Sequence, residues 1–208
     1  MFGQLASGVA ASVFLLCTWL APDTARAPGP LSVADPREDG GHSPSRQLKI
    51  PRPYMESNGG APVSGGLVVL RARYPSMAPE PLAAQAGVPR RDSVRIILEL
   101  TKGTRAQQDI GQFVLNTHLS GVHRLIEFDS RSVGQQVRIY RSRDNRDDAM
   151  SFVDAAEKTV FVLCALSTCR AQRSWGSSHM VSYQFDRRWQ SQAVAVDAAT
   201  VRLLDSFR

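Results

Sequence analysis

Lysine is scarce in this chain of 208 residues: only three of its 25 basic residues are lysines. The 19 acidic residues leave a formal charge of +6. Nucleic-acid binders usually gather cations on one element and place exposed aromatic side chains among them. Here arginines instead alternate with apolar residues along expected strands, at Arg71, Arg73, Arg95, Arg124 and Arg138. We therefore expect solvated sheet faces and no nucleic-acid partner.

Catalytic signatures are also missing. The chain has no Gly-x-Ser-x-Gly elbow, and the stretch from Asp144 to Glu157 lacks the central glycine of an EF-hand. Its acidic residues are typical of solvated turns. Hydrolase chemistry would rest on His118 or His123, with Ser120 or Asp129 nearby in space. We expect no cofactor and no bound metal, and a hydrolase stays open as an alternative.

Long apolar runs are absent except at the N-terminus, where Leu5–Ala21 carries no charge. Such a run is typical of a signal-peptide core or a short membrane anchor. It breaks at Pro22 and is followed by Ala25-Arg26-Ala27, the small-x-small form that a signal peptidase reads; no basic residue precedes it. We predict that residues 1–27 are a signal peptide or membrane anchor. The rest is then periplasmic or secreted, or else anchored to the membrane and facing the periplasm.

Cysteine occurs only three times, at Cys17, Cys164 and Cys169. Export with cleavage would leave an even pair in an oxidising compartment, so we predict a Cys164–Cys169 disulfide. Closing so short a loop contributes about 2 kcal/mol in the chain-entropy model, and its use is to fix a turn. A zinc site would need His179 and a fourth ligand, which no second Cys-x-x-Cys or His pair supplies.

Few apolar residues occur over 28–46, which is expected to be a flexible linker. A single α+β domain is expected over 47–208. It should begin with Leu48–Tyr54, where Pro51 and Pro53 favour an extended edge segment.

Period-two hydrophobicity predicts most of a sheet. The clearest strand has Val94, Ile96, Leu98 and Leu100 on one face. Further strands are predicted over 67–74, 122–128, 136–140, 150–153, 159–164 and 180–186. A short helix is expected within 105–119, and four prolines make 75–91 a long loop.

An amphipathic helix closes the chain after Asp186, the nearest capping residue. Its apolar stripe recurs every three or four residues, at Trp189, Ala193, Val196, Thr200, Leu203 and Phe207. In the preceding strand, Val181, Tyr183 and Phe185 should face the core, while Ser182 and Gln184 face water. The predicted fold class is α+β, a mostly antiparallel sheet of about six or seven strands with the C-terminal helix packed on one face.

Trp175 is the aromatic residue that core periodicity explains least. It is expected in the connection after Cys169, where an exposed Trp beside Arg173 would suit a partner-binding anchor. The alternative is that Trp175 folds back over the sheet edge. Tyr74 and the loop 75–91 would extend the same surface. We therefore predict Trp175, Arg173 and Tyr74 as binding residues.

The C-terminal fifty residues also carry a resemblance. It rests on the order Val162-Leu-Cys164, Cys169, His179, Val181-x-Tyr183-x-Phe185, Trp189 and Arg202-Leu-Leu-Asp-Ser-Phe207. This order resembles the C-terminal pattern of small exported proteobacterial proteins of unknown function, some of which resemble periplasmic immunity proteins that neutralise secreted antibacterial toxins. No family binding residues carry over to this chain.

The export signal and the missing catalytic constellation favour a non-enzymatic domain that binds a protein partner in the cell envelope. The resemblance implies an inhibitor or immunity protein whose partner is a toxin. Two alternatives stay open: an envelope hydrolase using His118 or His123, and a structural component of an envelope or secretion assembly.

Overall fold

The computed structural model describes residues 31–34, 47–56, 67–81, 90–100, 108–120, 125–128, 137–142, 147–176 and 179–208. The predicted signal peptide or anchor, residues 1–27, lies outside these ranges. Within them, no helix is both long and apolar enough to cross a membrane.

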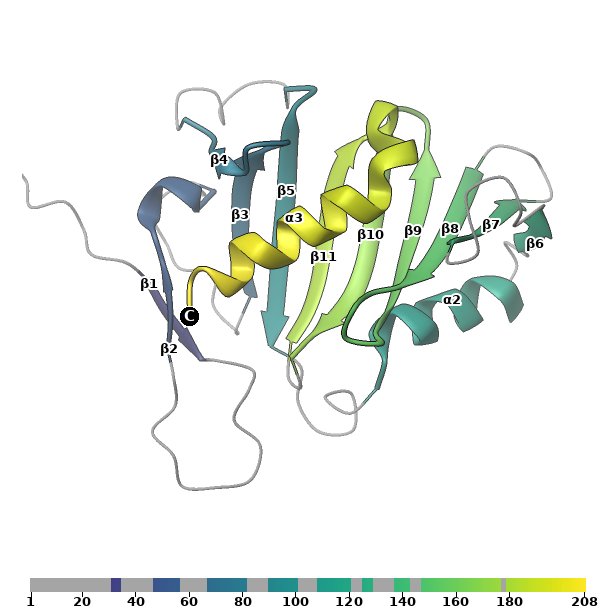
Figure 1. Cartoon of the computed structure of the whole chain (residues 1–208), viewed down its shortest axis with the longest axis horizontal. Coiled ribbons are helices and arrows are strands. Elements are labelled where there is room, and N and C mark those ends of the chain that lie inside the picture. Colours follow the sequence, from purple (N-terminus) through teal and green to yellow (C-terminus); the bar gives the residue numbers. More distant parts are fainter. Residues whose placement is uncertain are drawn as a thin grey trace, which may run out of the picture.

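A single antiparallel sheet dominates the structure, in the order β4-β3-β5-β11-β10-β9-β8-β7-β6 (Figure 1). Its strands are β3 (Leu67–Arg73), β4 (Ala78–Pro79), β5 (Ser93–Leu100), β6 (Leu125–Phe128), β7 (Val137–Ser142), β8 (Asp147–Val153), β9 (Thr159–Ala165), β10 (Thr168–Trp175) and β11 (His179–Asp186). The predicted α+β class is confirmed. The strand count is higher than expected because 168–175 is a full strand and because β4 adds a short edge strand.

The N-terminal part of the described chain differs from expectation. β1 (Leu31–Ala34) pairs antiparallel with β2 (Gln47–Ile50), so the stretch expected to be a linker contains a strand. Arg52–Tyr54 forms a 3₁₀ turn, η1, rather than an extended segment. The fixed φ of Pro53 suits such a turn, so proline did not exclude helical backbone there.

Short pieces of chain close the outer edge of β3. β4 pairs with Ala72 and Arg73, Met55 forms a bridge with Leu70, and the Glu56 amide donates to the Val69 carbonyl at 3.0 Å. Most of the hydrogen-bonding groups along this edge are thereby used.

Tight hairpins join the central strands. β8 and β9 pair as predicted, although β8 begins at Asp147, inside the expected charged turn. The β9–β10 hairpin contains the predicted disulfide, with Cys164 directly opposite Cys169 and their Cα atoms 4.0 Å apart. Both cysteines are fully buried. The disulfide therefore closes the hairpin one residue pair before its turn at Leu166 and Ser167.

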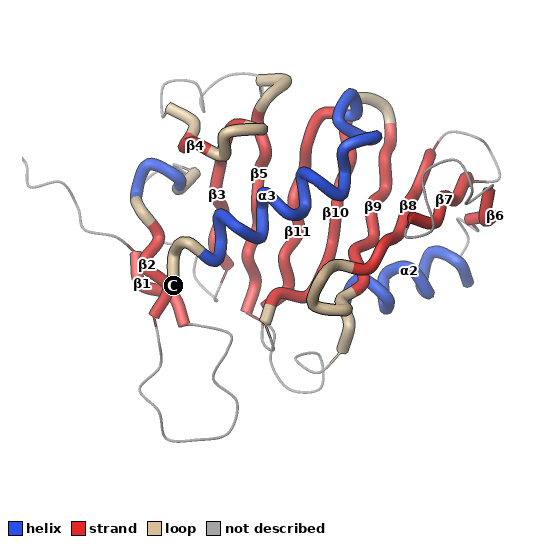
Figure 2. Tube along the Cα trace, in the orientation of Figure 1, coloured by secondary structure: helices blue, strands red, loops and turns tan. Residues whose placement is uncertain are grey.

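The C-terminal helix α3 (Ala193–Asp205) runs diagonally across the face of the central strands (Figures 1 and 2). The carboxylate of Asp186 accepts from the Arg188 amide at 2.9 Å and begins η4 (Arg187–Gln192), a 3₁₀ segment that leads into α3. The predicted stripe is confirmed: its members from α3 and Phe207 are buried, and Trp189 is half-buried. This face holds the main core.

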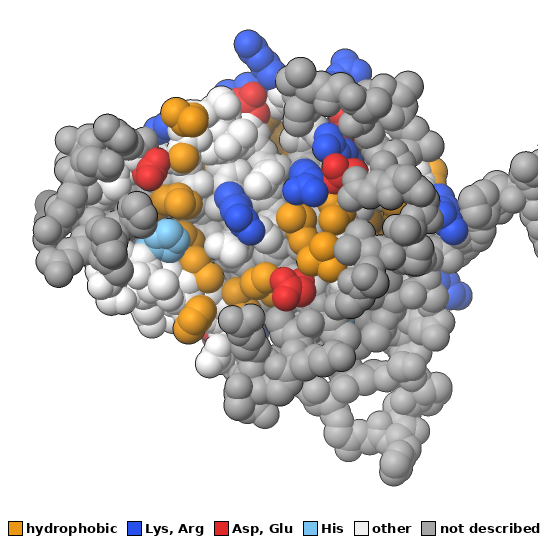
Figure 3. Space-filling view, turned by 180° about the vertical axis from the view of Figure 1, so that it is seen from behind, with side chains coloured by type: hydrophobic (Ala, Val, Ile, Leu, Met, Phe, Trp, Pro, Cys, Tyr) orange, Lys and Arg blue, Asp and Glu red, His pale blue; other side chains and the backbone are white. Residues whose placement is uncertain are grey.

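Helix α2 (Ile110–Ser120) packs on the opposite face, against β9 and β10. Leu115 joins Tyr140, Ala149 and Phe161 in a second, smaller core cluster. Within the described residues, no helix covers β3, β5 and β11 on this side, and apolar, basic and acidic side chains lie open on it (Figure 3). Ser182 is buried there, so the prediction that its face of β11 is solvated was wrong at this position.

Gly111 sets how closely α2 approaches the sheet. A Cβ atom at this position would lie 1.9 Å from the Thr159 carbonyl oxygen of β9, far inside a normal contact.

We predict that Gly111→Ala destabilises the protein by about 1–3 kcal/mol through overpacking, although alanine is the better helix former. Urea unfolding measures the change. Asn116→Ala, at an exposed site of the same helix, should stay within about 0.5 kcal/mol; equal stability of both variants would contradict the close contact.

Candidate functional site

A buried polar cluster lies between the sheet and α3, with Arg173 of β10 at its centre. Its Nη1 donates to Asp197 Oδ2 of α3 at 2.6 Å, and its Nη2 donates to Asp154 in the β8–β9 turn. Tyr183 of β11 donates its hydroxyl to Asp197 Oδ1 at 2.7 Å. Arg173, Tyr183 and Asp197 are all at most 3% exposed. The cluster thus ties two strands, one turn and one helix together.

Burial and charge act against each other in this cluster. Burial alone would lower the pKa of Arg173, but the charges of Asp197 and Asp154 raise that pKa above its ordinary value. Burial and the charge of Asp197 raise the pKa of Tyr183 well above its ordinary value. Burial also raises the pKa of Asp197, against the opposing effects of Arg173 and Tyr183. Tyr183 therefore stays protonated and Arg173 stays charged at neutral pH.

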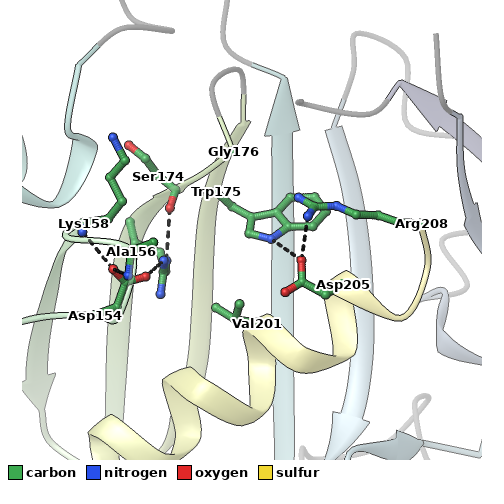
Figure 4. Close-up of a pocket in the computed structure, with 10 residues that line it drawn as sticks. Asp154, Ala156, Lys158, Ser174, Trp175, Gly176, Val201, Asp205 and Arg208 are labelled. Carbon is green, nitrogen blue, oxygen red and sulfur yellow. Dashed lines mark hydrogen bonds and ion pairs between the residues drawn. The ribbon is translucent and has the colours of Figure 1, made fainter. Parts of the chain in front are cut away.

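Next to the cluster lies a depression of about 400 Å³ (Figure 4). Trp175 forms one wall: its Nε1 donates to Asp205 Oδ1 at 3.3 Å, and the Arg208 guanidinium lies 4.2 Å from its ring centroid. On the other side, Asp154 accepts from the amides of Ala156 and Lys158 at 2.9 and 2.8 Å, which shapes the turn. The depression combines basic, acidic and aromatic groups.

The structure brings two of the three predicted binding residues together, because Arg173 and Trp175 line the same depression. Tyr74 lies elsewhere, under η4: its hydroxyl donates to Gln192 Oε1 at 3.1 Å, and its ring meets Trp189 edge-on at 5.1 Å. Their role in binding a partner stays a prediction.

Of the two interpretations of Trp175, the structure agrees with the buried one and not with the exposed anchor. The residue ends β10 and is only 4% exposed, because the end of α3 and Arg208 pack over its ring. Only Cys169, Ala171 and Trp175 mark the inward side of this strand as apolar, and Arg173 interrupts them. The sequence pattern therefore did not reveal the strand.

The histidines give no assembled catalytic group in the described residues. His118 on α2 stacks on Phe161 with ring centroids 5.0 Å apart, and His179 is buried edge-on to Trp175 at 5.9 Å. His123 and Asp129 lie outside the described ranges, so the hydrolase alternative built on them is untested. No set of three His, Cys, Asp or Glu side chains suited to hold a metal occurs within these ranges.

A second depression, of about 240 Å³, lies at the end of the sheet where β3, β5, β11 and the β9–β10 turn meet. Four arginines line it, Arg71, Arg90, Arg91 and Arg95. Arg71 was expected on a solvated face but is 7% exposed, because it pairs with Glu56 at 2.9 Å and lies 3.7 Å from Glu80. No sequence signal pointed to this grouping.

Comparison with known proteins gives one informative match. No family model matches the sequence, and no curated protein matches it. The structure is similar to a solved immunity protein of the Stenotrophomonas maltophilia type IV secretion system, with a TM-score of 0.57 and 14% sequence identity. The match covers 86% of this chain and 92% of the other. At this identity the likeness shows a shared fold, extending over nearly the full length of both proteins.

Arg173 should be critical for stability. We predict that Arg173→Met destabilises the protein by about 3–5 kcal/mol, because Asp197 and Asp154 lose the charge that compensates their burial. Adding Asp197→Asn should recover part of the loss, since the amide carries no charge and its oxygen still accepts from the Tyr183 hydroxyl. Urea unfolding of the single and double variants measures both effects. Arg170→Met, an exposed neighbour on β10, is the matched control, and an equal loss in that variant would contradict the role of the cluster.

Glu56 should make stability depend on acid pH. Burial opposes its charge, but Arg71 and Arg95 hold the pKa of this carboxyl below its ordinary value of 4.5. A carboxyl group whose pKa is lowered by folding stabilises the protein. This stabilisation is fully present above pH 4.5 and is lost as the pH falls through the pKa of the folded state. Glu56→Gln should therefore be less stable at neutral pH and should converge with the native protein at acid pH in thermal unfolding. Glu157→Gln, at an exposed turn, should run parallel to the native curve; a parallel Glu56→Gln curve would refute the linkage.

Proposed function

We propose that this chain is an exported inhibitor that binds and neutralises a toxic partner protein, in the manner of an immunity protein. The observation that carries the proposal is the fold likeness to a secretion-system immunity protein over 86% of this chain and 92% of that one. Function is still argued from the chain's own surfaces.

The chemistry of the Arg173 depression supports binding rather than catalysis. The two carboxylates that line it, Asp154 and Asp205, are both held by groups of the protein itself: Asp154 bonds to Arg173, and Asp205 accepts from Trp175 Nε1 and pairs with Arg208. The nearby Ser174 hydroxyl faces the other side of the sheet, where it donates to the Gln108 carbonyl and accepts from the Ile110 amide. The cluster around Arg173 therefore links the sheet to α3. The partner would contact the exposed surfaces around it.

Export is part of the proposal. The apolar segment in 1–27 would direct the chain out of the cytoplasm, and an oxidising compartment would permit the Cys164–Cys169 disulfide. The domain over 47–208, with the added strand β1, would then meet the toxin in the periplasm.

A protection experiment tests this proposal. Proteins encoded next to this chain are directed to the periplasm of susceptible cells, with or without the chain, and one that stops growth serves as the toxin. We expect the full-length chain to restore growth and to form a one-to-one complex with nanomolar Kd in calorimetry. A version lacking residues 1–27 should fold but fail to protect, because it stays in the wrong compartment. Absence of both protection and complex formation would refute the inhibitor function.

A further inference from the structure

The depression lined by Arg71, Arg90, Arg91 and Arg95, called here the arginine pocket, lies on the sheet face that α3 does not cover. Part of it is a row across four strands: Arg71 is directly opposite Arg95, Arg95 opposite Gln184, and Gln184 opposite Arg170. Like charges directly opposite each other on neighbouring strands are destabilising. The row therefore favours a negatively charged group beside it.

Within the described part of the chain, the acidic residues near the pocket bond to only some of its hydrogen-bond donors. Glu56 lies between two arginines, accepting from Arg71 Nη2 at 2.9 Å and from Arg95 Nε at 2.7 Å. Arg95 thus uses one of its five N–H donors in the bond to Glu56. Arg90 lies 3.7 Å from Asp92, and Asp186 is occupied as the cap of η4. The carboxylates hold the guanidinium groups in place without saturating them.

Two observations mark the pocket as incomplete. Arg71 Nε is buried and has no hydrogen-bond partner in the described part of the chain. Arg91 is exposed at the rim and makes no ion pair with the described residues. Guanidinium groups with free donors are suited to carboxylates, which they bind in a planar, two-pronged geometry.

An exposed leucine stands beside the pocket. Leu166 is 90% exposed at the tip of the β9–β10 turn, whose next residues, Ser167 and Thr168, line the pocket. Its φ is 51°, a left-handed conformation that glycine or asparagine adopts at lower cost. Neither core packing nor turn geometry therefore explains a leucine here. The disulfide beneath the turn holds it in place.

We infer that the arginine pocket and Leu166 bind an acidic segment of a partner polypeptide, with carboxylates on Arg91 and Arg95 and an apolar side chain against Leu166. A free anion would gain nothing from Leu166, whereas protein interfaces commonly combine arginine with an apolar anchor. The chain's charge of +6 complements such a segment. This inference deepens the proposed function, since the partner would be the neutralised protein.

Binding of short peptides tests the pocket independently of any toxin. The probes are the capped peptides Glu-Glu-Leu-Glu-Glu and Gln-Gln-Leu-Gln-Gln, and inorganic phosphate, titrated into the chain while backbone amide shifts are followed. We expect the acidic peptide alone to bind, with shifts at Thr168, Gln184 and Arg95. Arg91→Glu should weaken its binding about tenfold or more.

Substituting the leucine separates binding from folding. Leu166→Asn should weaken the acidic peptide several-fold while leaving the melting temperature unchanged or higher, because asparagine tolerates positive φ. Two matched controls should keep full affinity: Arg138→Glu, an exposed arginine on β7, and Glu157→Asn, an exposed turn residue with φ 59°.

Several outcomes would overturn the inference. Equal weakening by Arg91→Glu and Arg138→Glu would mean attraction by overall charge only. Phosphate binding without peptide binding would exclude a polypeptide ligand, and full affinity in Leu166→Asn would exclude the contact with Leu166 on which the inference rests. In the protection experiment, native activity of Arg91→Glu would refute the pocket and leave the inhibitor function standing. Peptide binding without any toxin complex would support the pocket and refute that function.

Discussion

The ion pairs of Arg173 hold the two main layers of this protein in one arrangement. The apolar stripe of α3 supplies most of the burial, but hydrophobic contact is non-directional and would tolerate several positions of the helix on the sheet. A guanidinium with bonds to both Asp197 and Asp154 tolerates only one position. Because all three groups are largely removed from water, any displacement of α3 would leave a charge without a partner. The helix, the β8–β9 turn and the end of β10 are therefore placed together, and the depression beside Trp175 follows from that placement.

Most of the fold could be predicted because its strands and final helix are strongly periodic. β5 alternates along its whole length, and the α3 stripe recurs every three or four residues. β10 was missed because an inward position holds arginine, so the alternation of Cys169, Ala171 and Trp175 is broken at its most informative point. Asp197 was missed for a related reason. A single acidic residue on a helix is typical of the solvated side, and Asp197 can be buried only because Arg173 of the sheet neutralises its charge. Local patterns cannot report a charge whose partner lies on another element.

The sites were less predictable than the fold because their residues come from different strands and turns. Arg173 and Trp175 are neighbours in sequence, and their proximity was foreseen, whereas the burial of Arg173 was not. The arginine pocket joins residues from β3, β5, β11 and the β9–β10 turn, which are far apart along the chain. Its row depends on the register in which Arg71 meets Arg95 and Arg95 meets Gln184. Strand order and register of this kind arise from the whole sheet, so the local pattern of one strand does not reveal which strand it will face.

The closed edge of β3 constrains the geometry of any complex. Partners of open sheets often bind by adding a strand to the edge, so that backbone hydrogen bonds supply the affinity and almost any extended sequence competes. Here β4, the Met55 bridge and the Glu56 amide already occupy that edge, and Pro79 has no amide proton to offer a neighbouring strand. Recognition on this side must therefore proceed through side chains on the face of the sheet. Selectivity would then reside in the side-chain chemistry of the two surfaces. Pairing of this edge with the same edge of a second copy of the chain is disfavoured for the same reason.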